Sequence, residues 1–175
     1  MRIMISFLMI MMFTFSLTAQ EDSVVKITGF KNLYRYQNFF IAGQPPVEEL
    51  EWLKSQGVRH IINLRTEEEN REVKATAYDE QAWCDKLGFS YDVIPVNGLE
   101  GYTPENLEKF IAAINKNEKT LIHCRSGRRA NDFFMAYLIE HDGYSVEEAT
   151  AIGRQIRFVI PLEKILDMQF FLGKP

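Results

Sequence analysis

The chain has few of the residues that bind metals or form disulfide bonds. It holds two cysteines, Cys84 and Cys124, and three histidines, His60, His123 and His141. The histidines are scattered without the spacing of metal ligands, so we expect no metal and no cofactor. Two cysteines allow at most one disulfide bond, and that bond would consume both thiols.

The sequence also lacks an excess of positive charge, internal repeats, low-complexity segments and a long apolar run within its body. Its 175 residues carry 20 basic and 24 acidic side chains, a formal net charge of −4. A mildly acidic body with one basic loop argues against a nucleic-acid partner and favours a small, local pocket for an anion. The length is that of about one domain, enough to bury a core.

The N-terminus has the features of a secretory signal peptide. Arg2 precedes an apolar run over residues 3–15, and small residues lead to a cleavage site after Ala19. The run is short for a membrane span, and nothing later reaches that length. An uncleaved anchor is the alternative. The pattern predicts a signal peptide at 1–19, one domain at 20–175, a periplasmic or secreted protein, and no membrane partner after cleavage.

The segment 120–130 contains most of the candidate catalytic and binding residues. It is typical of a buried strand that ends at Cys124, a tight basic loop, and a helix from about Asn131. Loop amides and the positive end of a helix dipole together bind anions. A cysteine at the head of such a loop is expected to exist partly as a thiolate, so Cys124 is the candidate nucleophile. The candidate phosphate-binding residues are Arg125, Ser126, Gly127 and Arg128, with Arg129 as the catalytic arginine that forks onto two oxygens.

Other interpretations of these residues remain open. An isolated Cys124 would more often be a buried structural thiol, but the glycine and arginines around it favour a functional role. We expect His123 to orient the loop by hydrogen bonding rather than to transfer a proton. Cys84 lies in a helical stretch with Trp83, so we expect it to be an inert core thiol that is not bonded to Cys124. Arg65 is expected to pair with a carboxylate at the sheet edge, and a role in binding the substrate is the alternative.

The Cys loop, from His123 through Cys124 and Gly127 to Arg129, resembles the signature of the protein tyrosine phosphatase superfamily. That signature has five residues between the cysteine and the arginine, whereas here four precede Arg129 and the family position holds Ala130. The shorter spacing is similar to the active loop of single-domain rhodaneses.

The flanking motifs favour the phosphatase side. Residues 41–45, 57–65 and 91–96 occur in the order found in the phosphatase-like domain family named after beta-lactamase-hydrolase-like proteins, which resembles dual-specificity phosphatases and has the short loop. The resemblance covers roughly residues 32–143. It implies a tyrosine-phosphatase-like fold, phosphoryl transfer to Cys124, and a phosphorylated protein or small phosphate ester as partner.

The resemblance also implies a carboxylic acid that protonates the leaving oxygen. Dual-specificity phosphatases carry an aspartate in the loop after the strand that matches residues 91–96. Here residues 97–101 contain no aspartate, and Glu100 is the candidate catalytic acid. An exposed loop glutamate without a role is the alternative. A missing acid would imply slow turnover, substrates with good leaving groups, or a pseudoenzyme.

Three functions follow from these residues. The first is an exported cysteine-dependent phosphatase that hydrolyses phosphotyrosine-type or small aryl phosphates through a Cys124 thiophosphate. The second is a rhodanese-type sulfurtransferase that carries a persulfide on Cys124. The third is a catalytically weak module that binds oxyanions or phosphopeptides.

Alternating strands and helices predict a three-layer α/β sandwich. Its mostly parallel sheet should have four or five strands, with helices on both faces and ligands bound beyond the carboxyl ends of the strands. The expected strands span 33–36, 39–42, 58–64, 89–96 and 119–123. The expected helices span 46–56, 72–87, 103–117, a segment from 145 and 161–172, and residues 67–71 are expected to be a charged loop.

Overall fold

A central β-sheet organises the chain in the computed structural model, which describes residues 23–157. Six strands lie in the order β1-β2-β3-β6-β4-β5, antiparallel from β1 to β3 and parallel from β3 to β5. The strands are β1 (Val25–Lys26), β2 (Leu33–Tyr36), β3 (Phe39–Ala42), β4 (Val58–Asn63), β5 (Ser90–Val93) and β6 (Lys119–His123). The mostly parallel sheet is confirmed, but the predicted number of four or five strands is wrong. The additional strand, β1, is two residues long, too short to show a period of alternation.

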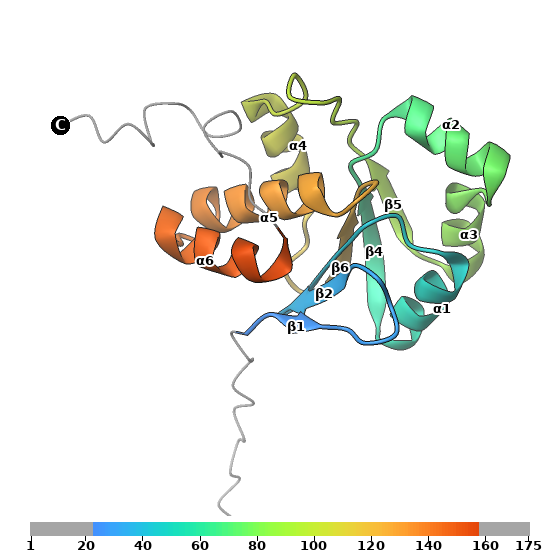
Figure 1. Cartoon of the computed structure of the whole chain (residues 1–175), viewed down its shortest axis with the longest axis horizontal. Coiled ribbons are helices and arrows are strands. Elements are labelled where there is room, and N and C mark those ends of the chain that lie inside the picture. The colour runs from blue at the N-terminus through green and yellow to red at the C-terminus, as the bar shows by residue number, and fades with distance from the viewer. Residues whose placement is uncertain (1–22, 158–175) are drawn as a thin grey trace, which may run out of the picture.

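Helices cover both faces of the sheet, which confirms the three-layer sandwich (Figure 1). One group lies beside β4 and β5, and the other packs across β3 and β6. The first group is α1 (Val47–Ser55), α2 (Glu67–Thr76) and α3 (Glu80–Leu87), and the second is α4 (Pro104–Ala113), α5 (Arg128–Glu140) and α6 (Val146–Ile156).

The two faces of the sheet bury separate hydrophobic cores. The face under α4, α5 and α6 is rich in aromatic rings, with Phe110, Phe133 and Tyr137 all fully buried. The hydrophobic core on the opposite face is smaller and includes Leu50 and Leu121. Burying each large apolar side chain contributes about 1.5–3 kcal/mol to stability. Because several such side chains of α5 pack on the sheet, the start of this helix is held in a fixed position next to β6.

The charged segment 67–71 is helical rather than a loop, which corrects the prediction. Thr66 caps α2 through a capping box, because its side chain accepts a bond from the Glu69 N–H while the Glu69 carboxylate accepts from the Thr66 N–H. The predicted single helix 72–87 is also wrong, since Asp79 caps a new helix, α3, and accepts a bond from the Ala82 N–H.

The ends of other elements differ by a few residues from the predictions. Strand β5 ends at Val93, three residues before the predicted end, and α5 begins at Arg128, three residues earlier than predicted. The predicted signal peptide at 1–19 and the predicted helix at 161–172 lie outside the described residues. Within residues 23–157, no helix combines the length and apolar character needed to cross a membrane.

Candidate active site

Cys124 lies at the carboxyl end of the central strand β6, where parallel sheets bind ligands. The residue is 1% exposed, and its Sγ accepts a hydrogen bond from the Gly127 N–H at 3.1 Å. Gly127 is the N-cap of α5, so the sulfur faces the positive end of that helix. This geometry favours a negative charge on the sulfur and on any anion bound beside it.

The neighbouring strand end holds the Cys loop in shape. The Gln44 N–H donates to the Arg125 carbonyl at 3.2 Å, and the Cys124 N–H donates to the Ala42 carbonyl at 3.4 Å. Gly127 has a φ of 90°, and a Cβ there would lie 3.3 Å from the Ala42 carbonyl group. The loop therefore requires glycine both for its backbone conformation and for its close approach to β3.

The guanidinium of Arg129 is fixed by three partners from separate parts of the chain. Its Nη1 donates to the carbonyls of Leu64 at 3.1 Å and Val96 at 2.8 Å, and its Nη2 donates to Oε1 of Glu69 at 2.7 Å. Burial lowers the pKa of Arg129, but Glu69 and the nearby Cys124 outweigh this effect and the pKa lies above its usual value. Arg129 is thus a cation held in place before any substrate arrives.

The Glu69 carboxylate is ionised because it is paired with Arg129. Burial raises the pKa of its carboxyl, but the hydrogen bonds from Arg129 and the Thr66 backbone outweigh burial and hold the pKa below its usual value. A carboxylate of this kind is a poor proton donor. Arg65 lies beside it, almost fully buried, and donates to the Gln44 side chain and the Glu69 carbonyl. Its structural role agrees with the prediction, but these two partners are not side-chain carboxylates.

A buried polar network lies beneath the Cys loop. His123 is fully buried, and its Nε2 lies 3.2 Å from Oε1 of Glu80. Burial lowers the pKa of His123, so its ring is neutral at physiological pH. The other oxygen of Glu80 accepts from Asn63 at 3.1 Å and from the Tyr91 hydroxyl at 3.2 Å. Among the described residues neither ring nitrogen of His123 has a hydrogen-bond partner, so its orienting role stays a prediction.

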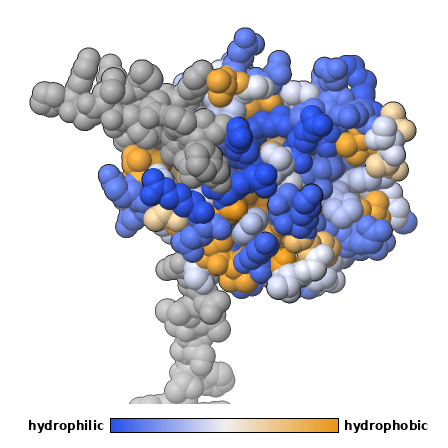
Figure 2. Space-filling view, viewed as in Figure 1, coloured by the Kyte–Doolittle hydropathy of each residue, from blue (hydrophilic) through white to orange (hydrophobic). Residues whose placement is uncertain are grey.

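A cavity of about 570 Å³ opens in front of the Cys loop. Its walls come from the Cys loop, from α2, and from the segment that follows β5. The lining residues are Thr66, Glu68, Glu69, Glu72, Asn97, Gly98, Leu99, Tyr102, Arg125, Ser126, Arg128 and Arg129. Figure 2 shows that the surface over α2 is largely hydrophilic, as expected for a site that takes a charged ligand.

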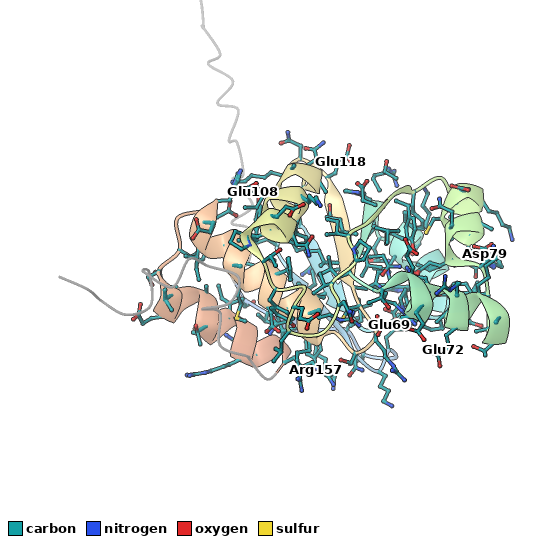
Figure 3. All side chains as sticks on the ribbon, turned by 90° about the horizontal axis from the view of Figure 1, so that it is seen from above. Glu69, Glu72, Asp79, Glu108, Glu118 and Arg157 are labelled. Carbon is teal, nitrogen blue, oxygen red and sulfur yellow. The ribbon has the colours of Figure 1, made fainter. Side chains whose placement is uncertain are left out.

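The structure brings most of the predicted site residues together, with one exception. Ser126 and the three arginines of the Cys loop line the cavity, and Cys124 lies buried behind them at the head of the same loop. Glu100 is exposed on the segment after β5 and does not line the cavity. The carboxylates that do line it come from α2, and Figure 3 shows Glu69 between α2 and the start of α5 with Glu72 on the same side of the helix. Sequence reasoning missed Glu68 and Glu69 because segment 67–71 was predicted to be a solvated loop, and it gave no role to Glu72 at the start of the predicted helix 72–87.

A second missed feature is the buried pair of Tyr102 and Asp132. The Tyr102 hydroxyl donates to Oδ2 of Asp132 at 2.9 Å, and burial together with the charge of Asp132 raises the pKa of Tyr102. Tyr102 lines the cavity, while Asp132 is fully buried in α5. The pair anchors the segment after β5 to the helix that begins at the Cys loop. Cys84 and Cys124 are both free thiols, as predicted.

Comparisons with known proteins agree with this geometry. Residues 19–155 match the family model described as DSP-PTPase phosphatase fused to NAD+ kinase. The chain belongs to this family. The predicted membership of the tyrosine phosphatase superfamily is therefore confirmed, and this DSP-PTPase domain is a dual-specificity-type, phosphatase-like hydrolase.

The DSP-PTPase domain is similar to the beta-lactamase hydrolase-like proteins of two Xylella fastidiosa strains, each 38% identical over 115 residues. That match covers 65% of this chain and 26% of each relative, so the chain spans about a quarter of their length.

Solved structures with the same fold include the DUF442 protein of Shewanella putrefaciens CN-32, with a TM-score of 0.59 at 23% identity over 81% of this chain and 92% of that one. PTPMT1 has a TM-score of 0.59 at 23% identity over 73% of this chain and 86% of that one. At such identities the likeness establishes the fold alone.

Proposed function

We propose that this DSP-PTPase domain is an exported cysteine-dependent phosphatase that hydrolyses phosphate monoesters of the phosphotyrosine or small aryl type. The observation that carries the proposal is the hydrogen bond of 3.1 Å from the Gly127 N–H to Sγ of Cys124 at the N-terminus of α5. A site that favours a thiolate by backbone donors and a helix dipole also favours phosphate oxygens next to that thiolate.

In the first step the Cys124 thiolate attacks phosphorus, the bond from phosphorus to the ester oxygen breaks, and the electron pair leaves on that oxygen. Water then attacks the phosphorus of the cysteinyl phosphate and loses a proton, which yields inorganic phosphate and regenerates the thiolate. Loop N–H groups and the fixed guanidinium of Arg129 stabilise the charge on the phosphoryl oxygens during both steps.

The availability of a proton donor for the leaving oxygen determines which phosphate esters the site can hydrolyse. Glu69 is ionised by its pairing with Arg129, and Glu100 lies outside the lining of the cavity. We therefore favour phenols, whose anions leave without full protonation, over alkyl alcohols. Glu100 stays a predicted proton donor, and in that role Glu100→Gln would slow the hydrolysis of alkyl phosphates more than that of 4-nitrophenyl phosphate.

The direct test is hydrolysis of 4-nitrophenyl phosphate by the purified, reduced protein, blocked by vanadate. Cys124→Ser should abolish turnover and still bind vanadate, because the loop amides and Arg129 remain. Cys84→Ser is the matched control, since Cys84 is buried in the core of the other sheet face, and it should retain turnover. Turnover by Cys124→Ser would contradict the proposal.

A sulfurtransferase is the second candidate, and the absence of Glu100 from the cavity lining favours it. The Cys124 thiolate would attack the outer sulfur of thiosulfate, the S–S bond would break, and sulfite would leave with the electron pair. Cyanide would then take the outer sulfur of the persulfide as thiocyanate, without a proton donor for a leaving oxygen. Thiocyanate formation without ester hydrolysis would select this function, and oxyanion or phosphopeptide binding without any turnover would select a binding module.

Export remains part of the proposal and rests on the predicted signal peptide. N-terminal sequencing of the protein recovered from a periplasmic or culture-medium fraction should begin at Gln20. Recovery of the protein from the membrane fraction with Met1 or Arg2 at its N-terminus would instead indicate an uncleaved anchor.

A further inference from the structure

Leu99 is an exposed apolar side chain in a cavity that is lined mostly by polar groups. Among the described residues, the exposed large hydrophobic side chains are Leu99, at 53%, and Val93, at 42%. Leu99 lines the Cys124 cavity, whereas Val93 does not. The other described lining residues are charged or polar, apart from Gly98 and the aromatic Tyr102, which is only 6% exposed. The accessible apolar contact that this lining offers to a ligand is therefore Leu99.

The turn that carries Leu99 has a closely packed backbone. Gly98 has a φ of 48°, in the left-handed region that favours glycine, and a Cβ at Gly101 would lie 2.4 Å from the Asn97 nitrogen. The Gly101 N–H donates to the Asn97 carbonyl at 2.9 Å, which closes the turn around Leu99 and Glu100. This backbone places Leu99 at the cavity wall and Glu100 outside it.

The end of the turn is attached to two helices. Nδ2 of Asn106, in the first turn of α4, donates to the Gly101 carbonyl at 2.9 Å. The Tyr102 hydroxyl is bonded to Asp132 of α5, and the Tyr102 ring packs against Phe133 with the ring centroids 5.7 Å apart. An isolated exposed leucine on a surface needs no explanation, but here the attached turn holds one at the wall of the cavity. A side chain positioned in this way contacts a ligand without the entropic cost of ordering a loop.

We propose that Leu99 is a specificity-determining residue, which packs against the aryl ring of the substrate while the Cys loop binds its phosphate. The inference rests on the proposed function and names the residue that recognises its substrate class. The cavity of about 570 Å³ has room for a phosphate and a ring together. An aryl ring covers the leucine without losing hydrogen bonds, whereas a sugar or polyol phosphate would bring hydroxyl groups against it. Leu99 therefore favours aryl phosphates over phosphates of sugars and polyols.

The test separates the ring of the ligand from its anion. Benzylphosphonate carries an aryl ring on an anion that cannot be hydrolysed, and inorganic phosphate has no ring. Both are measured as competitive inhibitors of 4-nitrophenyl phosphate hydrolysis, and both are titrated by calorimetry into Cys124→Ser with and without Leu99→Ala. Leu99→Ala should raise the dissociation constant of benzylphosphonate by about threefold to tenfold, as expected for the loss of part of one leucine contact. The constant for inorganic phosphate should stay unchanged.

Further variants separate an apolar contact from a structural role of the turn. Leu99→Met should keep the benzylphosphonate constant within about twofold, because methionine has a similar apolar volume, whereas Leu99→Asn should weaken binding as much as Leu99→Ala does. Val93→Ala is the matched control, because it truncates the other exposed apolar side chain outside the cavity lining, and it should leave both constants unchanged. Equal weakening of benzylphosphonate and inorganic phosphate by Leu99→Ala would show a general effect on the site and would overturn the proposal.

The two measurements distinguish a failure of this inference from a failure of the proposed function. Ester hydrolysis by the reduced protein together with an unchanged benzylphosphonate constant in Leu99→Ala would contradict the role of Leu99 and leave the phosphatase activity standing. A weaker benzylphosphonate constant in Leu99→Ala, without hydrolysis of any ester, would support the aryl contact and contradict the phosphatase activity. Failure of Cys124→Ser to bind benzylphosphonate would overturn the role of Leu99.

Discussion

Replacing Arg129 with lysine keeps the positive charge but removes the planar guanidinium group and its separate N–H donors. The guanidinium makes three hydrogen bonds that point in different directions, to the Leu64 and Val96 carbonyls and to Glu69. The single ammonium group of a lysine, at the end of a flexible side chain, can form about one of these three hydrogen bonds. We expect Arg129→Lys to be costly for this reason.

The magnitude follows from the bonds that are lost. Hydrogen bonds to charged groups contribute about 1.5–3 kcal/mol each, and two of them are lost. The pair is partly exposed, with 14% of the Arg129 side chain and 18% of the Glu69 side chain accessible, so screening by solvent reduces the total. We expect a loss of about 2–4 kcal/mol, divided between the free energy of unfolding and the transition state.

The assay measures both quantities. Urea denaturation reports the stability part, and kcat/KM for 4-nitrophenyl phosphate reports the transition-state part, where about 1.4 kcal/mol corresponds to a tenfold loss. Arg154→Lys is the control, because Arg154 is exposed on α6, lies outside the lining of the cavity and makes no side-chain bond to another described residue. A neutral Arg129→Lys beside a crippled Arg125→Lys or Arg128→Lys would refute the assignment of the fixed arginine.

Three further predictions concern thiols, burial and backbone. Burial and the charge of Glu80 raise the pKa of Cys84 to about 12, so iodoacetate at neutral pH should label Cys124 alone; a Cys84–Cys124 crosslink in non-reducing peptide maps would contradict this. Burial raises the pKa of Glu49 from 4.5 to about 7, so its share of stability is complete below the unfolded value and is lost as pH rises through 7. Glu49→Gln should therefore stabilise the fold by up to about 3 kcal/mol at about pH 8 and much less at about pH 5, measured by urea denaturation. Gly127→Ala should lower both the melting temperature and activity, because of its φ of 90° and the Ala42 carbonyl.

The Cys loop could be predicted because its chemistry is local in sequence. Cys124, Gly127 and Arg129 lie within six consecutive residues, between an apolar strand and an apolar helix. The alternation of strands and helices then predicts a mostly parallel sheet with ligands at the carboxyl ends of its strands, although it does not give the strand order. The wall made by α2 was missed although a signal existed. Thr66 followed by Glu69 is a capping box, which predicts a helix where a charged loop was expected.

The network beneath the loop had no local signal. His123 meets Glu80 across 43 positions of the chain, and the bond between Tyr102 and Asp132 spans 30. Such pairs depend on how helices pack on the sheet, which neither periodicity nor turn residues reveal. The strand β1 was missed because two residues cannot show alternation.

The measurement that tests the central claim most directly is the mass of Cys124 during turnover. The protein is mixed with 4-nitrophenyl phosphate, quenched in acid within the first turnover, and digested for mass spectrometry under non-reducing conditions. We predict that the peptide with Cys124 gains the mass of one phosphoryl group and that the peptide with Cys84 stays unmodified. Continued release of nitrophenol by a protein whose Cys124 has been blocked with iodoacetate, without any phosphorylated Cys124 peptide, would contradict the account.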